Sequence, residues 1–169
     1  MQEEKMSNPG QPIIERGSQG DVVRRAQRAL RRVPDHSVAV DGIFGAVTET
    51  AVKNFQGGAG LDVDGIVGDK TWEALPNGGP MPTLKLGSSH GAVADLQKVL
   101  HNGSVEGDWP SPGEPDGEFG PATKTSVEGF QKWGDVDVDG IVGDETWSVP
   151  LHAASATLET AVGLKWADD

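Results

Sequence analysis

Apolar residues recur at helical spacing in several short stretches of the chain. Residues 23–33 carry four apolar side chains on one helical face, and residues 93–100 repeat three of them. A second stretch, residues 48–55, follows the i, i+3, i+4, i+7 pattern and recurs over 123–130. Residues 69–75 predict a shorter third helix. Since alternation of apolar and polar residues never extends beyond a few positions, the pattern predicts short helices and no substantial sheet.

These stretches belong to a duplication, which emerges when the sequence is aligned with itself. Residues 41–75 match residues 116–150 without a gap, with 19 identities in 35 positions. Upstream, the match continues at an offset of 70, so the second copy carries five extra residues, within 102–115. The sequence therefore predicts two tandem three-helix repeats, at residues 13–75 and 84–150.

The remaining segments differ from the repeats in composition. We expect residues 1–12 to be a flexible N-terminus and residues 76–83, rich in proline and glycine, to be a linker. Residues 151–169 carry apolar side chains at helical spacing, which predicts an amphipathic C-terminal tail helix. The predicted fold class is all-α, with two repeats joined by a linker and followed by this tail.

A shorter motif, Asp-Gly-x-x-Gly-x-x-Thr, occurs twice in each repeat. Its four copies begin at Asp41, Asp64, Asp116 and Asp139. The first glycine suits a tight turn with positive φ, and the second opens a helix. The aspartates at the second loop of each repeat have two interpretations, as turn and cap residues or as calcium ligands: Asp62, Asp64 and Asp69, with Asp137, Asp139 and Asp144. An EF-hand loop needs glycine at position six and glutamate at position twelve. In this chain glycine follows the second aspartate and the later acidic residue comes too early, so the spacing favours turns.

The ordered pattern resembles the tandem peptidoglycan-binding domain that is appended to bacterial cell-wall hydrolases and carboxypeptidases. The matching segments are Gly17–Gly20, Val40–Gly45, Phe55–Gln56, Gly60–Gly68, Thr71–Trp72 and, in the second repeat, Gly87 to Trp147. The resemblance implies three-helix bundles, non-covalent attachment to the wall, no catalysis of its own and no cofactor. The implied partner is peptidoglycan, glycan or stem peptide, held in a shallow groove by the Asp-Gly loops.

Two departures from the family pattern separate the repeats. The first repeat is glycine-rich over residues 57–60, so we expect its second helix to end early. The second repeat has the insertion and places Trp133 where the first has Gly58. These differences leave the fold unchanged and leave open whether both repeats bind the same ligand.

The tryptophans divide into two classes. Trp72 and Trp147 occupy equivalent positions in the third helices and are predicted core residues. Trp109, in the insertion, and Trp133 have no counterpart, and an exposed indole can lie flat against an amino sugar. Packing between the repeats is the alternative for both. The candidate ligand-binding residues are Trp109, Glu118, Trp133, Asp62 and Asp137.

The charge and the missing cysteine exclude several functions. The formal net charge of −12 argues against nucleic acid and an anionic membrane as partners. Because the 169 residues include no cysteine, disulfides, thiolate metal sites and cysteine nucleophiles are excluded. The four histidines show no metal-ligand spacing, so no metal site is expected. Too few residues lie outside the repeats to form a catalytic cleft, so the chain is not expected to be an enzyme.

A row of arginines has two interpretations. Arg24, Arg25, Arg28, Arg31 and Arg32 crowd the first predicted helix, with Arg16 just before it. They are a solvated helix face or a surface for carboxylates of a stem peptide or an acidic partner.

The sequence is compatible with more than one cellular location and binding partner, so a second function stays open. The first residues lack an apolar signal segment, so the protein stays inside the cell, leaves by another route or has lost its signal. The main hypothesis is a non-catalytic wall-binding protein, in the cell wall or outside the cell. The alternative is a cytoplasmic adaptor in a phage or other intracellular assembly, which binds a protein partner through the tail helix.

Overall fold

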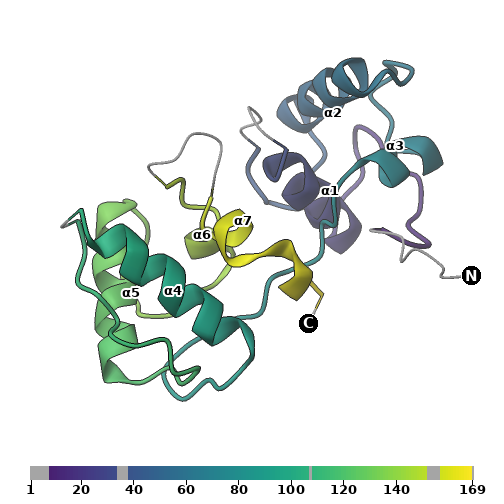
Figure 1. Cartoon of the computed structure of the whole chain (residues 1–169). Helices are drawn as coiled ribbons and strands as arrows, with labels where there is room; N and C mark the ends of the chain where they lie inside the picture. Colours follow the sequence, from purple (N-terminus) through teal and green to yellow (C-terminus); the bar gives the residue numbers. More distant parts are fainter. Residues whose placement is uncertain (1–7, 34–37, 107, 152–156, 169) are drawn as a thin grey trace, which may run out of the picture. The chain divides into compact units, whose positions relative to one another are not determined.

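The computed structural model describes residues 8–33, 38–106, 108–151 and 157–168. The chain divides into two compact units, residues 1–80 and 81–169. The first holds α1 (Asp21–Arg31), α2 (Ala46–Ala59) and α3 (Asp69–Ala74). The second holds α4 (Ala92–Ser104), α5 (Pro121–Trp133), α6 (Asp144–Trp147), α7 (Leu158–Val162) and the 3₁₀ turn η1 (Leu164–Trp166) (Figure 1). Among the described residues β-pairing is limited to isolated bridges, which confirms the all-α prediction.

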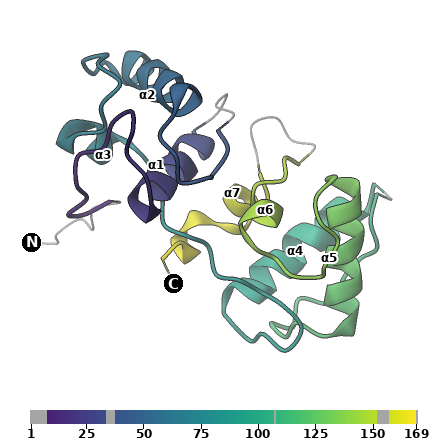
Figure 2. The same cartoon turned by 180° about the vertical axis from the view of Figure 1, so that it is seen from behind.

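The first unit is a three-helix bundle closed by its N-terminal segment. Val23, Ala26 and Leu30, predicted on one face of α1, are completely buried. Trp72 of α3 is 3 % exposed, as predicted for a core residue, and its indole N–H donates to the carbonyl of Pro12 at 3.0 Å. Figure 2 shows the three helices of this unit from behind.

Helix α2 continues through the glycine-rich stretch, so the expectation that it ends early is wrong. It runs to Ala59, and Gly60 follows in the left-handed conformation with φ of 73°. The side chain of Gln56 is buried and hydrogen-bonded to the following loop, which holds this turn helical although each glycine costs about 1 kcal/mol relative to alanine. The left-handed glycine then ends the helix without steric penalty.

Two arginines, Arg25 in α1 and Arg32 directly after it, bind the first residues of the predicted linker instead of facing solvent. Arg32 is 7 % exposed, and its Nη1 donates to the carbonyls of Asn77 and Gly79 at 2.6 and 2.8 Å. Arg25 donates to the side chains of Asn8 and Asn77 at 2.8 and 3.1 Å. The solvated-face interpretation is therefore wrong for these two arginines.

The beginning of the predicted linker packs against the first unit, and its end packs into the second. The boundary between the two units falls inside the linker, after Pro80. Gly78 approaches α1 so closely that an added Cβ would overlap the carbonyl of Arg25. On the other side, Met81 is 5 % exposed in the core of the second unit. Asn8 is also buried, so the expected flexible N-terminus does not extend to it, and residues 1–7 lie outside the described part.

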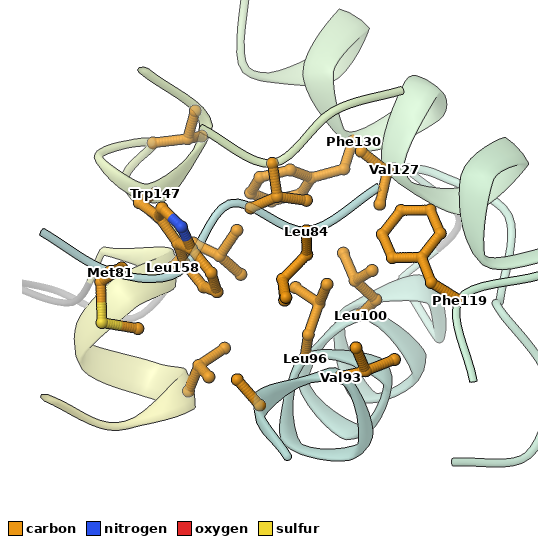
Figure 3. Close-up of a cluster of buried hydrophobic side chains, with 14 of the residues drawn as sticks. Met81, Leu84, Val93, Leu96, Leu100, Phe119, Val127, Phe130, Trp147 and Leu158 are labelled. Carbon is orange, nitrogen blue, oxygen red and sulfur yellow. The ribbon is translucent and has the colours of Figure 1, made fainter. Parts of the chain in front are cut away.

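The second unit repeats the bundle around a larger core. Figure 3 shows Leu84 at its centre, with Val93, Leu96 and Leu100 of α4 below and Phe130 of α5 above. Trp147 is completely buried, as predicted, and its indole N–H donates to the carbonyl of Pro82 at 2.9 Å. This bond matches the one that Trp72 makes to Pro12 in the first unit.

The predicted tail helix is confirmed only in part. Helix α7 has five residues, and the tail residues 152–156 lie outside the described part of the chain. Leu158 and Val162 are buried in the core of the second unit, where α7 contacts α4 and α6. In Figure 3 Leu158 lies beside Trp147. The apolar face that was expected to receive a partner is therefore covered by the unit itself.

Trp166 anchors the end of the described tail. Its indole N–H donates to a carboxylate oxygen of Asp95 at 3.0 Å. Its ring forms a T-shaped contact with the ring of His90, with 5.4 Å between the ring centroids. Because Asp95 and His90 belong to α4 and the residues before it, the last described turn is tied to the first helix of the unit.

Candidate ligand-binding site at the Asp-Gly loops

Each Asp-Gly loop surrounds a buried glutamine. The four are Gln27, Gln56, Gln97 and Gln131, each at most 1 % exposed. Nε2 of Gln56 lies 2.9 Å from Asp64 Oδ1 and from the carbonyl oxygen of Ile66. It lies 3.1 Å from Thr71 Oγ1. The Oε1 atom of Gln56 accepts the N–H groups of Asp64 and Gly65, at 3.1 and 3.0 Å.

The other glutamines repeat this network almost completely. Gln27 and Gln131 make the same five contacts with the loops that begin at Asp41 and Asp139. Gln97 lacks one of them, because the N–H of Asp116 donates to the carbonyl of Glu114 instead. A primary amide both donates and accepts, so one side chain joins the turn to the threonine of the next helix. This explains why aspartate, glycine and threonine recur at fixed spacing.

The aspartates that begin the loops are ionised turn residues. Asp64 Oδ1 also accepts the N–H of Ile66, two residues on, at 2.9 Å. The bond from Ile66 and then that from Gln56 lower the pKa of Asp64. The pKa of Asp116 and of Asp139 is lowered by the equivalent bonds, and that of Asp41 is lowered mainly by Gln27 and then by Ile43. The turn interpretation is thus confirmed for Asp64 and Asp139, and Asp41 and Asp116 form the same turn.

A shallow hollow of about 240 Å³ lies beside the second loop of the first unit. Ile13, Leu61 and Ile66 form its apolar side, and its charged lining consists of the carboxylates of Asp62, Asp64 and Asp69 and the ammonium of Lys70. The side chains of Asp62 and Lys70 are exposed and form no hydrogen bond or ion pair with the rest of the described chain. The hollow thus offers an apolar surface with one uncommitted cationic group, Lys70, and two uncommitted anionic groups, Asp62 and Asp69.

The predicted acidic ligand residues occupy different loops. Asp62 lines the hollow. Asp137 is its equivalent in the second unit and is also exposed. Glu118 is exposed on the other loop of the second unit, where its backbone N–H donates to Asp116 at 2.9 Å. These three positions stay predictions for ligand contacts, and the structure brings only Asp62 into the hollow.

The two candidate tryptophans pack against each other instead of standing on the surface. Trp109 is 4 % exposed, and its indole N–H donates to the carbonyl of Leu100 at 2.8 Å. Its ring forms T-shaped contacts with the rings of Phe130 and Trp133, with 5.0 and 4.9 Å between the ring centroids. Because its faces are covered, Trp109 is placed where no sugar ring could stack on it. Trp133 is half-buried beside the same core, and its role as a platform stays a prediction.

The metal interpretation gains no geometric support. Among the described residues, no group of three histidine, cysteine, aspartate or glutamate side chains could hold a metal ion. His90 Nδ1 accepts the N–H of Ala92 at 3.0 Å, and His101 Nδ1 lies 2.8 Å from the hydroxyl of Ser111. The other two histidines, His36 and His152, lie outside the described residues.

Two kinds of residue at this site were not predicted from the sequence: the buried glutamines, and the exposed residues Lys70 and Ile13. The glutamines were visible as identities between the repeats, but a polar residue inside an apolar helical pattern does not reveal its partners. Lys70 and Ile13 were missed for the opposite reason: neither is repeated in the second unit, where Glu145 and Thr83 stand. Comparing the repeats for differences would have found them.

Known proteins are similar to this chain over about 63 residues, close to the length of one repeat. The spore cortex-lytic enzyme of Bacillus cereus is 41 % identical over 63 residues, which make up 37 % of this chain and 24 % of the enzyme. The zinc D-Ala-D-Ala carboxypeptidase of Streptomyces albus G is 38 % identical over 64 residues, 37 % of this chain and 25 % of the enzyme. A crystal structure of the SleB N-terminal domain is 40 % identical, with a TM-score of 0.35, and the match covers 37 % of this chain and 85 % of that one.

The chain spans about a quarter of the length of these curated relatives. No helix in the described part of the chain is long and apolar enough to cross a membrane. The profile of the putative peptidoglycan binding domain family matches twice, at residues 19–75 and 89–149, and each match covers one of the two bundles with its glutamine-centred loops. The chain therefore belongs to the putative peptidoglycan binding domain family, of which it carries two tandem copies.

Proposed function

We propose that this protein is a non-catalytic module that attaches to bacterial peptidoglycan through its Asp-Gly loops. The observation that carries the proposal is the hollow of the first unit, which lies on a loop of the matched domain and includes Asp62 and Lys70. Peptidoglycan offers amino sugars with apolar faces and peptides with carboxylates and amines, and the lining of the hollow complements both kinds of group.

The size of the hollow fits weak binding to a repeating polymer. At about 240 Å³ it is smaller than the roughly 300–1,000 Å³ of pockets that enclose small molecules. It accommodates about one sugar ring or two peptide units, which supports only modest affinity at a single site. A wall polymer repeats its units many times, so rebinding and a second domain raise the overall affinity.

The chemistry of the loop favours binding over catalysis. The lowered pKa of Asp64 keeps this carboxylate ionised at neutral pH, so it is a poor proton donor. Its Oδ1 already accepts bonds from Gln56 and Ile66. Asp62 and Lys70 are solvated and face a shallow surface instead of a closed cleft. These groups can hold a ligand but lack the water-excluding surroundings that raise catalytic power.

We place the protein at the cell wall. The adaptor alternative was favoured by the lack of an apolar signal segment and by a free tail helix, and the burial of Leu158 and Val162 removes the support from the tail helix. A protein partner elsewhere on the molecule has no specific observation in its favour.

Sedimentation with purified peptidoglycan sacculi tests the proposal on the intact chain. We expect saturable binding that persists at about 150 mM salt, where charge attractions beyond about 8 Å are screened. The supernatant is analysed for released wall fragments at the same time. Absence of binding at both low and physiological salt would refute the attachment, and release of fragments would refute the non-catalytic role.

A further inference from the structure

The two units can be compared residue by residue around the hollow. Ile14 is bridged to Val67 in the first unit, and Leu84 is bridged to Val142 in the second. Gln56 and Gln131 make the same five contacts with their loops. The offsets of 70 before the insertion and 75 after it therefore hold in space as well as in sequence.

Most residues of the hollow are identical in the two units. The shared pairs are Gln56 and Gln131, Asp62 and Asp137, Asp64 and Asp139, Ile66 and Ile141, Gly68 and Gly143, Asp69 and Asp144, and Thr71 and Thr146. The position of Lys70 is taken by Glu145, and that of Ile13 by Thr83. The backbone scaffold is thus constant, whereas one charge is reversed and one of the three apolar residues, the exposed Ile13, is replaced by a hydroxyl. Leu61 is replaced by Val136, so that position stays apolar.

Lys70 is the cation of the first hollow. Its exposed ammonium makes no ion pair with any described residue. Ile13, on the apolar side, is 64 % exposed although it is a large aliphatic residue. A free cation beside an exposed apolar wall is suited to a peptide whose backbone or methyl groups cover the wall while a carboxylate meets the ammonium.

In the second unit, Glu145 occupies the position that Lys70 has in the first. Its Oε1 accepts the N–H of Asp137 at 3.4 Å, so the glutamate lies over the loop. The carboxylates of Asp137, Asp139 and Asp144 belong to the same loop and helix start, but Asp62, Asp64 and Asp69 occupy the equivalent positions in the first unit, so the local difference in charge is Glu145 in place of Lys70. The second unit carries 5 basic and 15 acidic residues, against 9 and 11 in the first, so the surrounding field also opposes an anion.

We propose that the hollow of the first unit selects a carboxylate-bearing peptide of the wall polymer, which Lys70 binds, and that Glu145 makes the second unit reject the same group. This inference rests on the proposed function and names the part of the polymer that the hollow recognises. An uncharged sugar would not distinguish lysine from glutamate at this position. The charge reversal therefore assigns the peptide, and not the glycan, to this hollow.

NMR titration of the intact ¹⁵N-labelled chain tests the inference at each loop separately. The probe is a soluble stem tetrapeptide of peptidoglycan, and the matched probe is the same peptide with its carboxylates converted to amides. We expect the free acid to shift the backbone amide signals of Ile66 and Lys70 and to leave those of Ile141 and Glu145 unchanged. The amidated peptide should bind up to about fivefold more weakly, since an exposed ion pair is worth up to about 1 kcal/mol.

Two charge reversals complete the test. Lys70→Glu should weaken binding of the free acid about tenfold or more, because an attraction becomes a repulsion. Glu145→Lys should produce new shifts at Ile141 and residue 145. Lys85→Glu is the matched control, because it changes the net charge equally, does not line the hollow and reproduces the glutamate found at the equivalent position, Glu15.

The outcomes separate this inference from the proposed function. Equal affinity of wild type and Lys70→Glu for the free acid would overturn the role of Lys70 even if sacculi still bind. Shifts at both loops of the wild type, or none gained by Glu145→Lys, would overturn rejection by Glu145. A chain that binds no sacculi fails the proposed function first, and a loss of affinity in Lys85→Glu equal to that in Lys70→Glu would reduce the effect to net charge.

Discussion

Replacing Gln56 with alanine should destabilise the first unit severely, because one side chain satisfies several buried groups. Gln56 is 1 % exposed, and the N–H of Gly65 and the hydroxyl of Thr71 that it contacts also belong to buried residues. Leaving a buried polar group without a partner costs about 1–3 kcal/mol. Water can reach the exposed Asp64 and the half-buried Ile66, so we count only the two buried groups and expect a loss of about 2–6 kcal/mol.

This loss is comparable with the whole stability of the unit. At roughly 0.05–0.15 kcal/mol per residue, a unit of about 80 residues has about 4–12 kcal/mol. Urea titration of the ¹⁵N-labelled chain measures it, through the indole N–H signals of the tryptophans. Trp72 is the one tryptophan of residues 1–80 and reports the first unit, while Trp147 reports the second as an internal reference.

Thr50→Ala is the matched control for this prediction. Thr50 lies on the exposed side of the same helix, so its replacement should change the free energy of unfolding by no more than about 0.5 kcal/mol. Gln97→Ala should cost less than Gln131→Ala in the second unit, because Asp116 already donates its N–H to Glu114. A loss below about 1 kcal/mol in Gln56→Ala would show that water replaces the amide, and the account of the motif would fail.

Three further predictions concern the stability of the units. Asp135 has φ of 58° where the first repeat has Gly60, so Asp135→Gly should stabilise the second unit by about 1 kcal/mol in urea titration, and an unchanged midpoint would contradict the assumed strain. Trp109→Ala should cost the second unit about 3–5 kcal/mol; a smaller loss with weaker binding to sacculi would restore its role as a ligand platform. The pKa values of the four loop aspartates are lowered from 3.8 in the folded state, so their stabilisation is complete above about pH 4 and disappears as the pH falls through the folded values. Thermal unfolding from pH 2 to 6 should show a reduced acid dependence in Asp64→Asn, and identical profiles would contradict the role of the Asx-turn.

The architecture of the fold was predictable because local pattern and tertiary packing agree over most of each repeat. Apolar spacing placed α1 and its buried face, and the duplication placed the second bundle. The end of α2 was not predictable, because glycine propensity points one way and the tertiary bonds of Gln56 point the other. Nothing in the spacing of the insertion reveals that Trp109 fills the space left by Gly103, where an added Cβ would lie 2.2 Å from the indole.

The candidate site was predicted in its location but not in its composition. The resemblance directed attention to the Asp-Gly loops, and Asp62 does line the hollow. However, the repeated aspartates were weighed as possible ligands when their chief role is to form turns around the glutamines. The arginine row was misread for a related reason: the carbonyls that Arg32 binds belong to a segment distant in sequence.

These errors have a common physical origin, and it shows where specificity should be sought in a duplicated chain. Residues that are identical in both repeats include those that both need in order to fold, such as Gln56 with its loop, and their side chains are already committed to internal bonds. A ligand must instead meet groups that the fold leaves uncommitted. Lys70 and Ile13 are such groups, and both change in the second repeat without disturbing the network beneath them. Identity between the copies therefore identifies the scaffold, and the exposed differences on that scaffold are where a difference in ligand between the two repeats should be sought.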